Sequence, residues 1–227
     1  LVLTGLEVLK PWPLKVVIDH VLARQVPPWW AFGDSPTVLL GWAAAALVAL
    51  HGADWFTSRG TAKSSGTRVH SVSGDCARPG LYEFPMGNTV KELLEACGAK
   101  DTQAVQVGGP SGVLLGPPEF GRRLCFEDLP SAGAFMVFGP GRDLLEVVRN
   151  FAHFFEHESC GFCTPCRVGT ALLRRSMDTL AGRRGTRRDV KDALRLSQLL
   201  RDTSHCGLGH SACAPFLALH ERFKPTL

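Results

Sequence analysis

The sequence carries little excess charge of either sign, which argues against a nucleic-acid-binding protein. Its 227 residues include 25 Lys and Arg against 21 Asp and Glu, so the formal net charge is +4. Domains that bind nucleic acid carry a larger and more clustered positive charge. Much of the excess lies in residues 182–188 (GRRGTRR), which we interpret as a solvated connection between two helices. We therefore predict no nucleic-acid partner.

Two glycine-rich signatures are also absent from the sequence. No GxGxxG run follows a predicted strand, and no Walker A loop occurs. Such glycines let backbone amides approach the phosphates of a nucleotide, so their absence argues against a nucleotide site in this chain. A secretory signal is not predicted either. Residues 1–10 lack a basic start, and no small-residue cleavage site follows a short apolar core.

Composition changes abruptly near residue 60. All five tryptophans precede this point and all eight cysteines follow it. Residues 35–53 carry no formal charge, and a run of roughly 20 apolar residues is long enough to cross a bilayer. We expect residues 36–56 to contact a membrane as a helix, with a buried helix of a folded domain as the alternative. Arg59 and Lys63 follow this run, which would place its C-terminal end in the cytoplasm.

Residues 7–22 (EVLKPWPLKVVIDHVL) resemble the start of an ABC exporter membrane domain. No nucleotide-binding domain of that family accompanies them in the sequence. The resemblance therefore does not imply transport.

Residues 60–140 have the pattern of a small β-rich module. Short runs that alternate apolar and polar residues are separated by Gly and Pro, which is typical of strands and turns. The predicted strands are residues 68–74, 81–85, 104–109 and 134–139, and the predicted helix is residues 90–97. This order favours a β-grasp, ubiquitin-like fold. Cys76, Cys97 and Cys125 stand alone in the module, and we expect small buried side chains there.

The strings VSGDCARPGLYEFP and AVQVGGPSG resemble the soluble-ligand-binding β-grasp (SLBB) domain of the flavin-bearing subunit of complex I. That name implies a ligand, but the module contains no catalytic grouping in its sequence. We therefore interpret it as a packing module.

Residues 141–227 are predicted to form a helical bundle that carries a metal centre. Residues 143–157 place Phe151, Phe154 and Phe155 at helical spacing, and we expect these rings in the core. The sequence ESCGFCTPCRVG follows and contains a C-x2-C-x2-C motif made by Cys160, Cys163 and Cys166.

A fourth thiolate would complete a [4Fe–4S] cluster, because such clusters are usually held by four cysteines. Cys206 is the best candidate, since Gly207 and Gly209 beside it let the backbone approach an inorganic core. The C-x2-C-x2-C motif also precedes a helix that should begin near Pro165. The free amides and the dipole of a helix N-terminus favour an anionic cluster.

Several alternatives stay open at this point. Zinc also binds four cysteines, although its sites more often pair two C-x2-C knuckles. Cys213 could replace Cys206 as the fourth ligand. His205 and His210 could be ligands, but a hydrogen-bonding or solvent-facing role is favoured. Arg167 is a candidate to offset cluster charge.

HESCGFCTPCRVG and SHCGLG together resemble the C-terminal cluster domain of the flavin-bearing, NADH-oxidising subunit of complex I, NAD-reducing hydrogenases and NAD-dependent formate dehydrogenases. The resemblance implies that Cys160, Cys163, Cys166 and Cys206 ligate a [4Fe–4S] cluster that passes electrons between FMN and other iron–sulfur centres. It also implies partner subunits that carry flavin or iron–sulfur groups. FMN and NAD are not expected on this chain, because the glycine-rich segment of the family is missing.

The sequence thus predicts an α+β chain of three parts. These are an N-terminal segment of hydrophobic helices at residues 1–59, a β-grasp SLBB-like domain at residues 60–140 and a four-helix-type bundle with the cluster at residues 141–227. We expect a one-electron relay on the cytoplasmic face, tethered to the membrane or free, that belongs to an NADH-linked oxidoreductase and does not oxidise NADH alone. The alternative is a structural or interaction protein whose cluster only stabilises the bundle.

Overall fold

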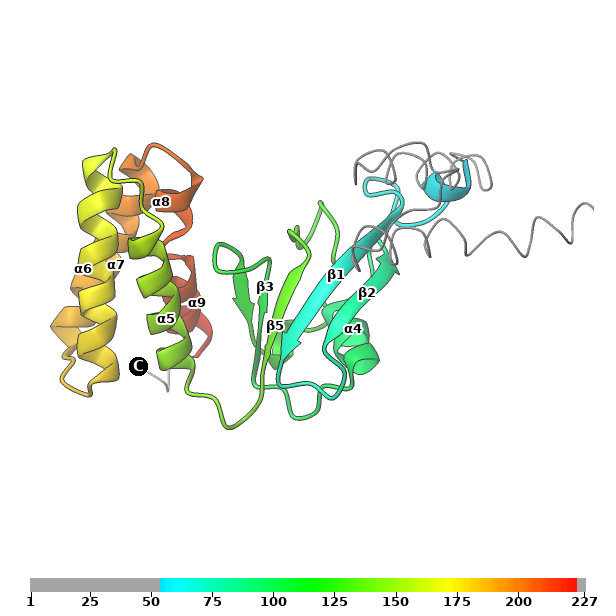
Figure 1. The fold of residues 1–227 in the computed structure, drawn as a ribbon, viewed down its shortest axis with the longest axis horizontal. Coiled ribbons are helices and arrows are strands. Elements are labelled where there is room, and N and C mark those ends of the chain that lie inside the picture. Colours follow the sequence, from blue (N-terminus) through cyan, green and yellow to red (C-terminus); the bar gives the residue numbers. More distant parts are fainter. Residues whose placement is uncertain (1–53, 224–227) are drawn as a thin grey trace, which may run out of the picture. The chain divides into compact units, whose positions relative to one another are not determined.

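The computed structural model describes residues 54–223 (Figure 1). The chain divides into two compact units, residues 1–60 and residues 61–227. In the described part of the first unit, the Arg59 guanidinium lies 5.3 Å from the centre of the Trp55 ring. Among residues 54–223, no helix is both long and apolar enough to cross a membrane. The exporter-like stretch and residues 36–53 of the predicted membrane segment lie outside the described residues.

A five-stranded mixed sheet forms the first half of the second unit. The strand order is β2-β1-β5-β3-β4, in which β1 and β5 are parallel and all other neighbours are antiparallel. The first and last of the strands in residues 54–223 therefore lie side by side, which requires a long connection between them. The strands are β1 (Thr67–Gly74), β2 (Gly80–Pro85), β3 (Ala104–Val107), β4 (Val113–Leu115) and β5 (Ala134–Phe138).

Helix α4 (Val90–Cys97) covers one face of this sheet. Thr89 caps its start, because the Thr89 hydroxyl accepts the Glu92 amide proton and the Glu92 carboxylate accepts the Thr89 amide proton. The left-handed conformation of Gly98 ends it. Leu93 packs in the same core as Val105 of the sheet, so the apolar side of α4 and the sheet shield each other.

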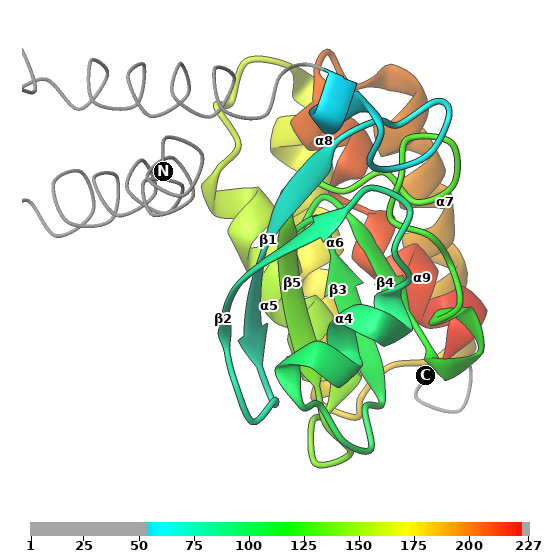
Figure 2. The same ribbon diagram turned by 90° about the vertical axis from the view of Figure 1, so that its right-hand side faces the viewer.

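The opposite face of the sheet packs against the helices that follow. Ala104 and Leu114 belong to a core that also contains Leu173 and Phe216. Figures 1 and 2 show the same arrangement, with α4 on one side of the sheet and helices α5 to α9 on the other. Strand β3 is buried along its whole length because both of its faces are covered.

Five helices follow the sheet in the described part of the second unit. Helices α5, α6 and α7 pack in succession, and α9 contacts both α5 and β4. Their apolar sides meet at residues such as Leu173, Met177 and Leu200, all of which are buried. The helices are α5 (Leu144–His157), α6 (Thr164–Ala181), α7 (Arg187–Thr203), α8 (Gly207–Ser211) and α9 (Ala214–Arg222).

The segment between sheet and helices, residues 139–142, is held by one carboxylate. Asp75 follows β1 and accepts hydrogen bonds from Nε and Nη2 of Arg142 at 2.8 and 2.7 Å. It also accepts the Gly139 amide proton at 3.0 Å. These bonds, foremost those from the Arg142 side chain, lower the pKa of Asp75 to about 2.

The mixed architecture predicted from sequence is confirmed, including all four predicted strands and helix 90–97. Residues 182–188 are exposed, as predicted, but only residues 182–186 connect α6 to α7, because Arg187 and Arg188 begin α7. Strand β4 was not predicted, because its three residues follow a GGPSG stretch that signals only a turn. The expectation for Phe154 was wrong: Phe151 and Phe155 are buried, but Phe154 points outward and is 43% exposed. The three domain boundaries stay a prediction.

Replacing Asp75 by Asn should destabilise the chain at neutral pH by about 1 kcal/mol, because an ion pair and a backbone hydrogen bond are weakened. The pKa of Asp75 is lowered in the folded chain, so its contribution is complete above the ordinary pKa of 3.8 and is lost as the pH falls toward 2. Urea unfolding followed by circular dichroism should show that the difference in free energy of unfolding between wild type and Asp75→Asn shrinks as the pH falls from 3.8 toward 2.

Asp202→Asn, which removes an exposed carboxylate bonded to Gln198, is the matched control for loss of one surface charge. A difference in free energy of unfolding between wild type and Asp75→Asn that stays constant from pH 5 to pH 2 would contradict this account.

Candidate metal centre

The first three cysteines lie where the chain passes from α5 to α6. Gly161 has a φ of +76°, a left-handed conformation that side-chain-bearing residues rarely adopt and that reverses the chain between Cys160 and Cys163. Cys163 is the N-cap residue of α6, and Cys166 lies in its first turn. The Arg167 side chain donates a hydrogen bond from Nη1 to the Gly161 carbonyl oxygen at 3.1 Å, which closes the loop.

Cys206 reaches the same region from the other direction. It is the N-cap residue of α8, directly after the short segment that ends α7. The α5–α6 connection and α8 lie at the same end of the helices (Figure 1). At Gly209, a Cβ atom would stand 2.5 Å from Cβ of Ser204 and 3.2 Å from Cβ of Cys166. Only glycine therefore permits α8 to approach α6 this closely.

The four cysteines, called the cysteine quartet below, lie within electrostatic reach of one another. The backbone N–H of His205 donates to Cys163 and lowers the pKa of that thiol. Burial raises the pKa of the Cys166 thiol, and the charges of Cys163, Cys206 and Cys160 raise it further. Four thiolates this close are unfavourable unless a cation offsets their charge, and metal binding provides that charge.

The quartet is buried on one side and open on the other. Cys166 is only 4% exposed and its sulfur lies 3.4 Å from Oγ of Ser159. Cys160 and Cys206, in contrast, are exposed. Phe162, between two quartet members, is 78% exposed, and its ring centre lies 5.7 Å from that of His205. A group bound here would be held against the helices and would still reach the surface.

A single ion and a cluster require different spacings of the four thiolates. Among residues 54–223, no three His, Cys, Asp or Glu side chains lie close enough to hold one metal ion. Four thiolates around one zinc would have sulfur atoms about 3.8 Å apart, since the Zn–S bond is about 2.3 Å. In a four-iron cluster each thiolate binds a different iron, so the sulfurs lie farther apart.

Ser204 provides a further polar group at this place. Its side chain is 8% exposed, and Oγ finds no hydrogen-bond partner in the described part of the chain. Because Ser204 and Cys166 both border Gly209, the hydroxyl lies beside the quartet. It is free to donate a hydrogen bond to a thiolate or to an inorganic sulfide. The sequence did not indicate this residue, and only its position before Cys206 could have drawn attention to it.

The other sequence candidates occupy different positions. Cys213 is buried in the helical core, where its thiol donates to the Ser197 carbonyl oxygen at 3.5 Å. The His210 ring contacts the Arg201 carbonyl oxygen and is exposed. A hydrogen-bonding or solvent-facing role was predicted for His205, and its backbone amide donates to Cys163 while the residue is exposed. The cationic Arg167 bonds to the loop backbone, not to a cysteine.

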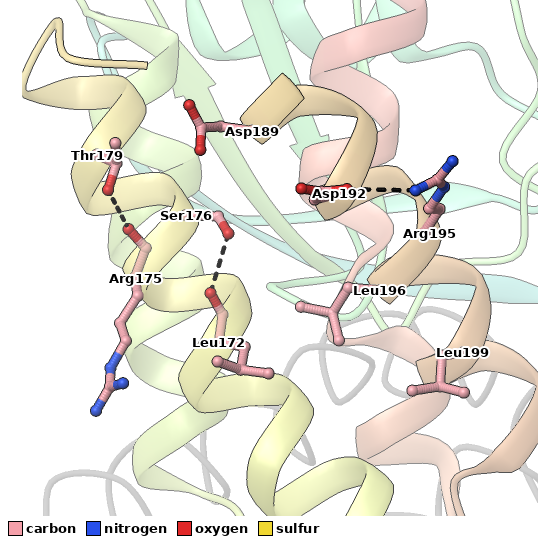
Figure 3. A pocket seen from close by; sticks show the side chains of 9 residues that line it. All are labelled: Leu172, Arg175, Ser176, Thr179, Asp189, Asp192, Arg195, Leu196 and Leu199. Carbon is pink, nitrogen blue, oxygen red and sulfur yellow. Dashed lines mark hydrogen bonds and ion pairs between the residues drawn. The ribbon is translucent and has the colours of Figure 1, made fainter. Parts of the chain in front are cut away.

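A surface groove of about 590 Å³ lies between α6 and α7, and no quartet cysteine lines it (Figure 3). Its hydroxyl groups are bonded to their own helix, since Ser176 donates to the Leu172 carbonyl oxygen and Thr179 to the Arg175 carbonyl oxygen. Asp192 pairs with Arg195 at 3.5 Å. These hydroxyl groups and the Asp192 carboxylate are thus already paired, and they do not converge on a common point.

Two family models match the second unit. The SLBB domain matches residues 69–114, which contain β2, α4 and β3. The NADH-ubiquinone oxidoreductase-F iron-sulfur binding region matches residues 146–227, which include the whole quartet. The second match indicates a [4Fe–4S] cluster on this chain.

Curated proteins and solved structures extend these matches. The NAD-reducing hydrogenase HoxS subunit alpha of Cupriavidus necator is 44% identical over 80% of this chain and 30% of its own length. A subunit of the NADH-quinone oxidoreductase of Mycobacterium tuberculosis is 35% identical over 78% of this chain and 42% of its own length. The crystal structure of an NAD+-reducing [NiFe]-hydrogenase in the H2-reduced state aligns with a TM-score of 0.77 at 42% identity, over 84% of this chain and 34% of that one.

The chain therefore spans less than half the length of these relatives. Their names describe subunits of redox complexes that use NAD or NADH together with a quinone or hydrogen. Residues 69–114 are an SLBB domain, residues 146–227 are an NADH-ubiquinone oxidoreductase-F iron-sulfur binding region, and the chain is a homologue of the matching subunits of NADH-quinone oxidoreductases and NAD-reducing hydrogenases.

Proposed function

We propose that this chain relays single electrons through a [4Fe–4S] cluster held by Cys160, Cys163, Cys166 and Cys206. The observation that carries the proposal is the meeting of two helix N-termini, those of α6 and α8, at the cysteine quartet. A bound [4Fe–4S] cluster supplies a one-electron redox centre. The second family match supports the cluster, and the residues around the quartet support its ligand set.

The surrounding residues serve the cluster in distinct ways. The His205 amide donates to Cys163 and favours its thiolate form, which is the form that binds iron. Cys163 and Cys206 are the N-cap residues of α6 and α8, and the dipole at a helix N-terminus favours negative charge there. The buried Cys166 and the Ser204 hydroxyl fix the inner side, where a hydrogen bond to sulfur raises a cluster's reduction potential.

The open side of the quartet suits exchange with other redox groups. Cys160 and Cys206 are exposed, so a redox group on another subunit can come close to the cluster. Oxidation of NADH removes a hydride, which a flavin accepts and passes on as single electrons. We therefore infer that flavin or iron–sulfur groups outside this chain give electrons to the cluster and take them from it.

A purely structural cluster is the competing function. The quartet joins the beginning of α6 to the end of α7, so a cluster would also tie these helices together. The two functions differ in one property. A relay cluster survives repeated one-electron reduction and oxidation, whereas a structural cluster needs only to persist in one state.

Replacing Cys206 by Ala should abolish the stable four-iron cluster, because the fourth iron then lacks a thiolate. After anaerobic reconstitution, iron and acid-labile sulfide analysis should give about four irons per wild-type chain and far fewer for the variant. Cys213→Ala is the control, since Cys213 lies in the helical core and bonds to Ser197. Full cluster content in Cys206→Ala, with loss in Cys213→Ala, would transfer the fourth ligand to Cys213.

The close approach of α8 to α6 gives a second, independent test. Gly209→Ala should lower cluster content several-fold, because the new methyl group would overlap Ser204 and press on Cys166. Gly207→Ala is the matched control two residues earlier, where a Cβ atom meets nothing within 4 Å. The iron-to-protein ratio and the visible absorbance of the two variants decide the matter. Equal cluster content in the two variants would show that the close approach of α8 to α6 is not needed for cluster binding.

A further inference from the structure

Two cysteines outside the quartet lie together in the sheet module. Cys76 is in the turn after β1, and Cys97 is the last residue of α4. Cys76 packs against the core to which Cys97 belongs. Cys97 is fully buried, whereas Cys76 is partly exposed. No sequence pattern pairs them, because 20 residues separate them and neither belongs to a motif.

The backbone holds the two segments in contact. The Arg78 amide donates to the Cys97 carbonyl oxygen at 2.9 Å, and the Ala77 amide donates to the Gly98 carbonyl oxygen at 3.4 Å. The Arg78 side chain adds a bond from Nη2 to the Ala96 carbonyl oxygen at 2.8 Å. The turn after β1 is therefore fastened to the end of α4 by the two residues that follow Cys76.

The thiols of this pair interact with each other. Burial raises the pKa of the Cys97 thiol, and the adjacent Cys76 thiol raises it further. Cys97 also donates a hydrogen bond to the Leu94 carbonyl oxygen at 3.3 Å. The third cysteine of the module differs, since Cys125 contacts the Arg123 carbonyl oxygen at 3.6 Å.

We propose that Cys76 and Cys97 form a reversible disulfide when the chain meets a hydroperoxide. The partly exposed Cys76 thiolate attacks the peroxide, the O–O bond breaks, and Cys76 becomes a sulfenic acid while water or an alcohol leaves. Cys97 then loses its proton and its sulfur attacks the Cys76 sulfur. The S–O bond breaks, and the leaving hydroxide takes up that proton and departs as water. Two thiols are oxidised by two electrons, one peroxide is reduced by two electrons, and a dithiol reductant reverses the change.

The position of the pair gives the oxidation a structural consequence. Asp75, next to Cys76, holds residues 139–142 through Arg142 and Gly139. Those residues connect the sheet to the helices that carry the quartet. A disulfide would fix the turn after β1 to α4. It would therefore restrict the movement of Asp75, which holds residues 139–142. This inference does not rest on the proposed electron relay, because neither cysteine belongs to the quartet.

Peptide mapping of the full-length chain tests the proposal. The reconstituted chain is treated with hydrogen peroxide, its free thiols are alkylated under denaturing conditions, and it is digested with trypsin. Cleavage after Arg68, Lys91 and Lys100 places Cys76 and Cys97 in separate peptides, residues 69–91 and 92–100. Mass spectrometry should find these two peptides linked, and prior treatment with dithiothreitol should separate them.

Two variants test whether Cys97 is the partner of Cys76 in the disulfide. Cys97→Ser should remove the link and leave Cys76 as a sulfenic acid that dimedone traps, whereas Cys125→Ser should leave the link unchanged. Peptides 69–91 and 92–100 that both remain fully alkylated after peroxide treatment would overturn the proposal. A link from Cys76 to Cys125 or to a quartet cysteine, in place of Cys97, would overturn it as well.

Discussion

The meeting of two helix N-termini at the cysteine quartet is the constraint on which the second unit depends. Helix α6 has 18 residues and α7 has 17, and at about 1.5 Å per residue the two run nearly the same length in opposite directions. The end of α7 therefore returns to the level where α6 began. This match brings Cys206 back to Cys166 across forty residues of sequence. Packing of Gly169 of α6 against Leu200 of α7 allows the two helices to lie close together.

The sheet module supports this arrangement from one side. Ser211 of α8 donates a hydrogen bond to Ser111 of the β3–β4 loop at 3.2 Å, and Arg222 of α9 pairs with Glu119 at 2.6 Å. Ala104 and Leu114 extend the helical core onto the sheet. The short helix that carries Cys206 is thus held by α6 and α7 on one side and by the sheet module on the other, which explains how five residues can position a ligand.

Local signals in the sequence predicted most of the fold and the quartet. Thr89 with Glu92, Gly98 and the alternating strands act within a few residues, so their pattern can be read directly. Contacts between distant segments could not be predicted in this way. The Ser204 hydroxyl, the His205 amide at Cys163 and the Cys76–Cys97 pair arise only when segments far apart in sequence meet. Phe154 was misplaced because helical spacing does not reveal the limits of the buried face.

Mössbauer spectroscopy of the chain reconstituted with 57Fe, recorded before and after reduction, tests the central claim most directly. We predict that about four irons per chain give the spectrum of one [4Fe–4S] cluster, that dithionite adds one electron per cluster, and that reoxidation restores the first spectrum. Isolated iron sites in the first spectrum would contradict the ligand set. A cluster that breaks down on reduction would contradict the electron relay and favour a structural cluster.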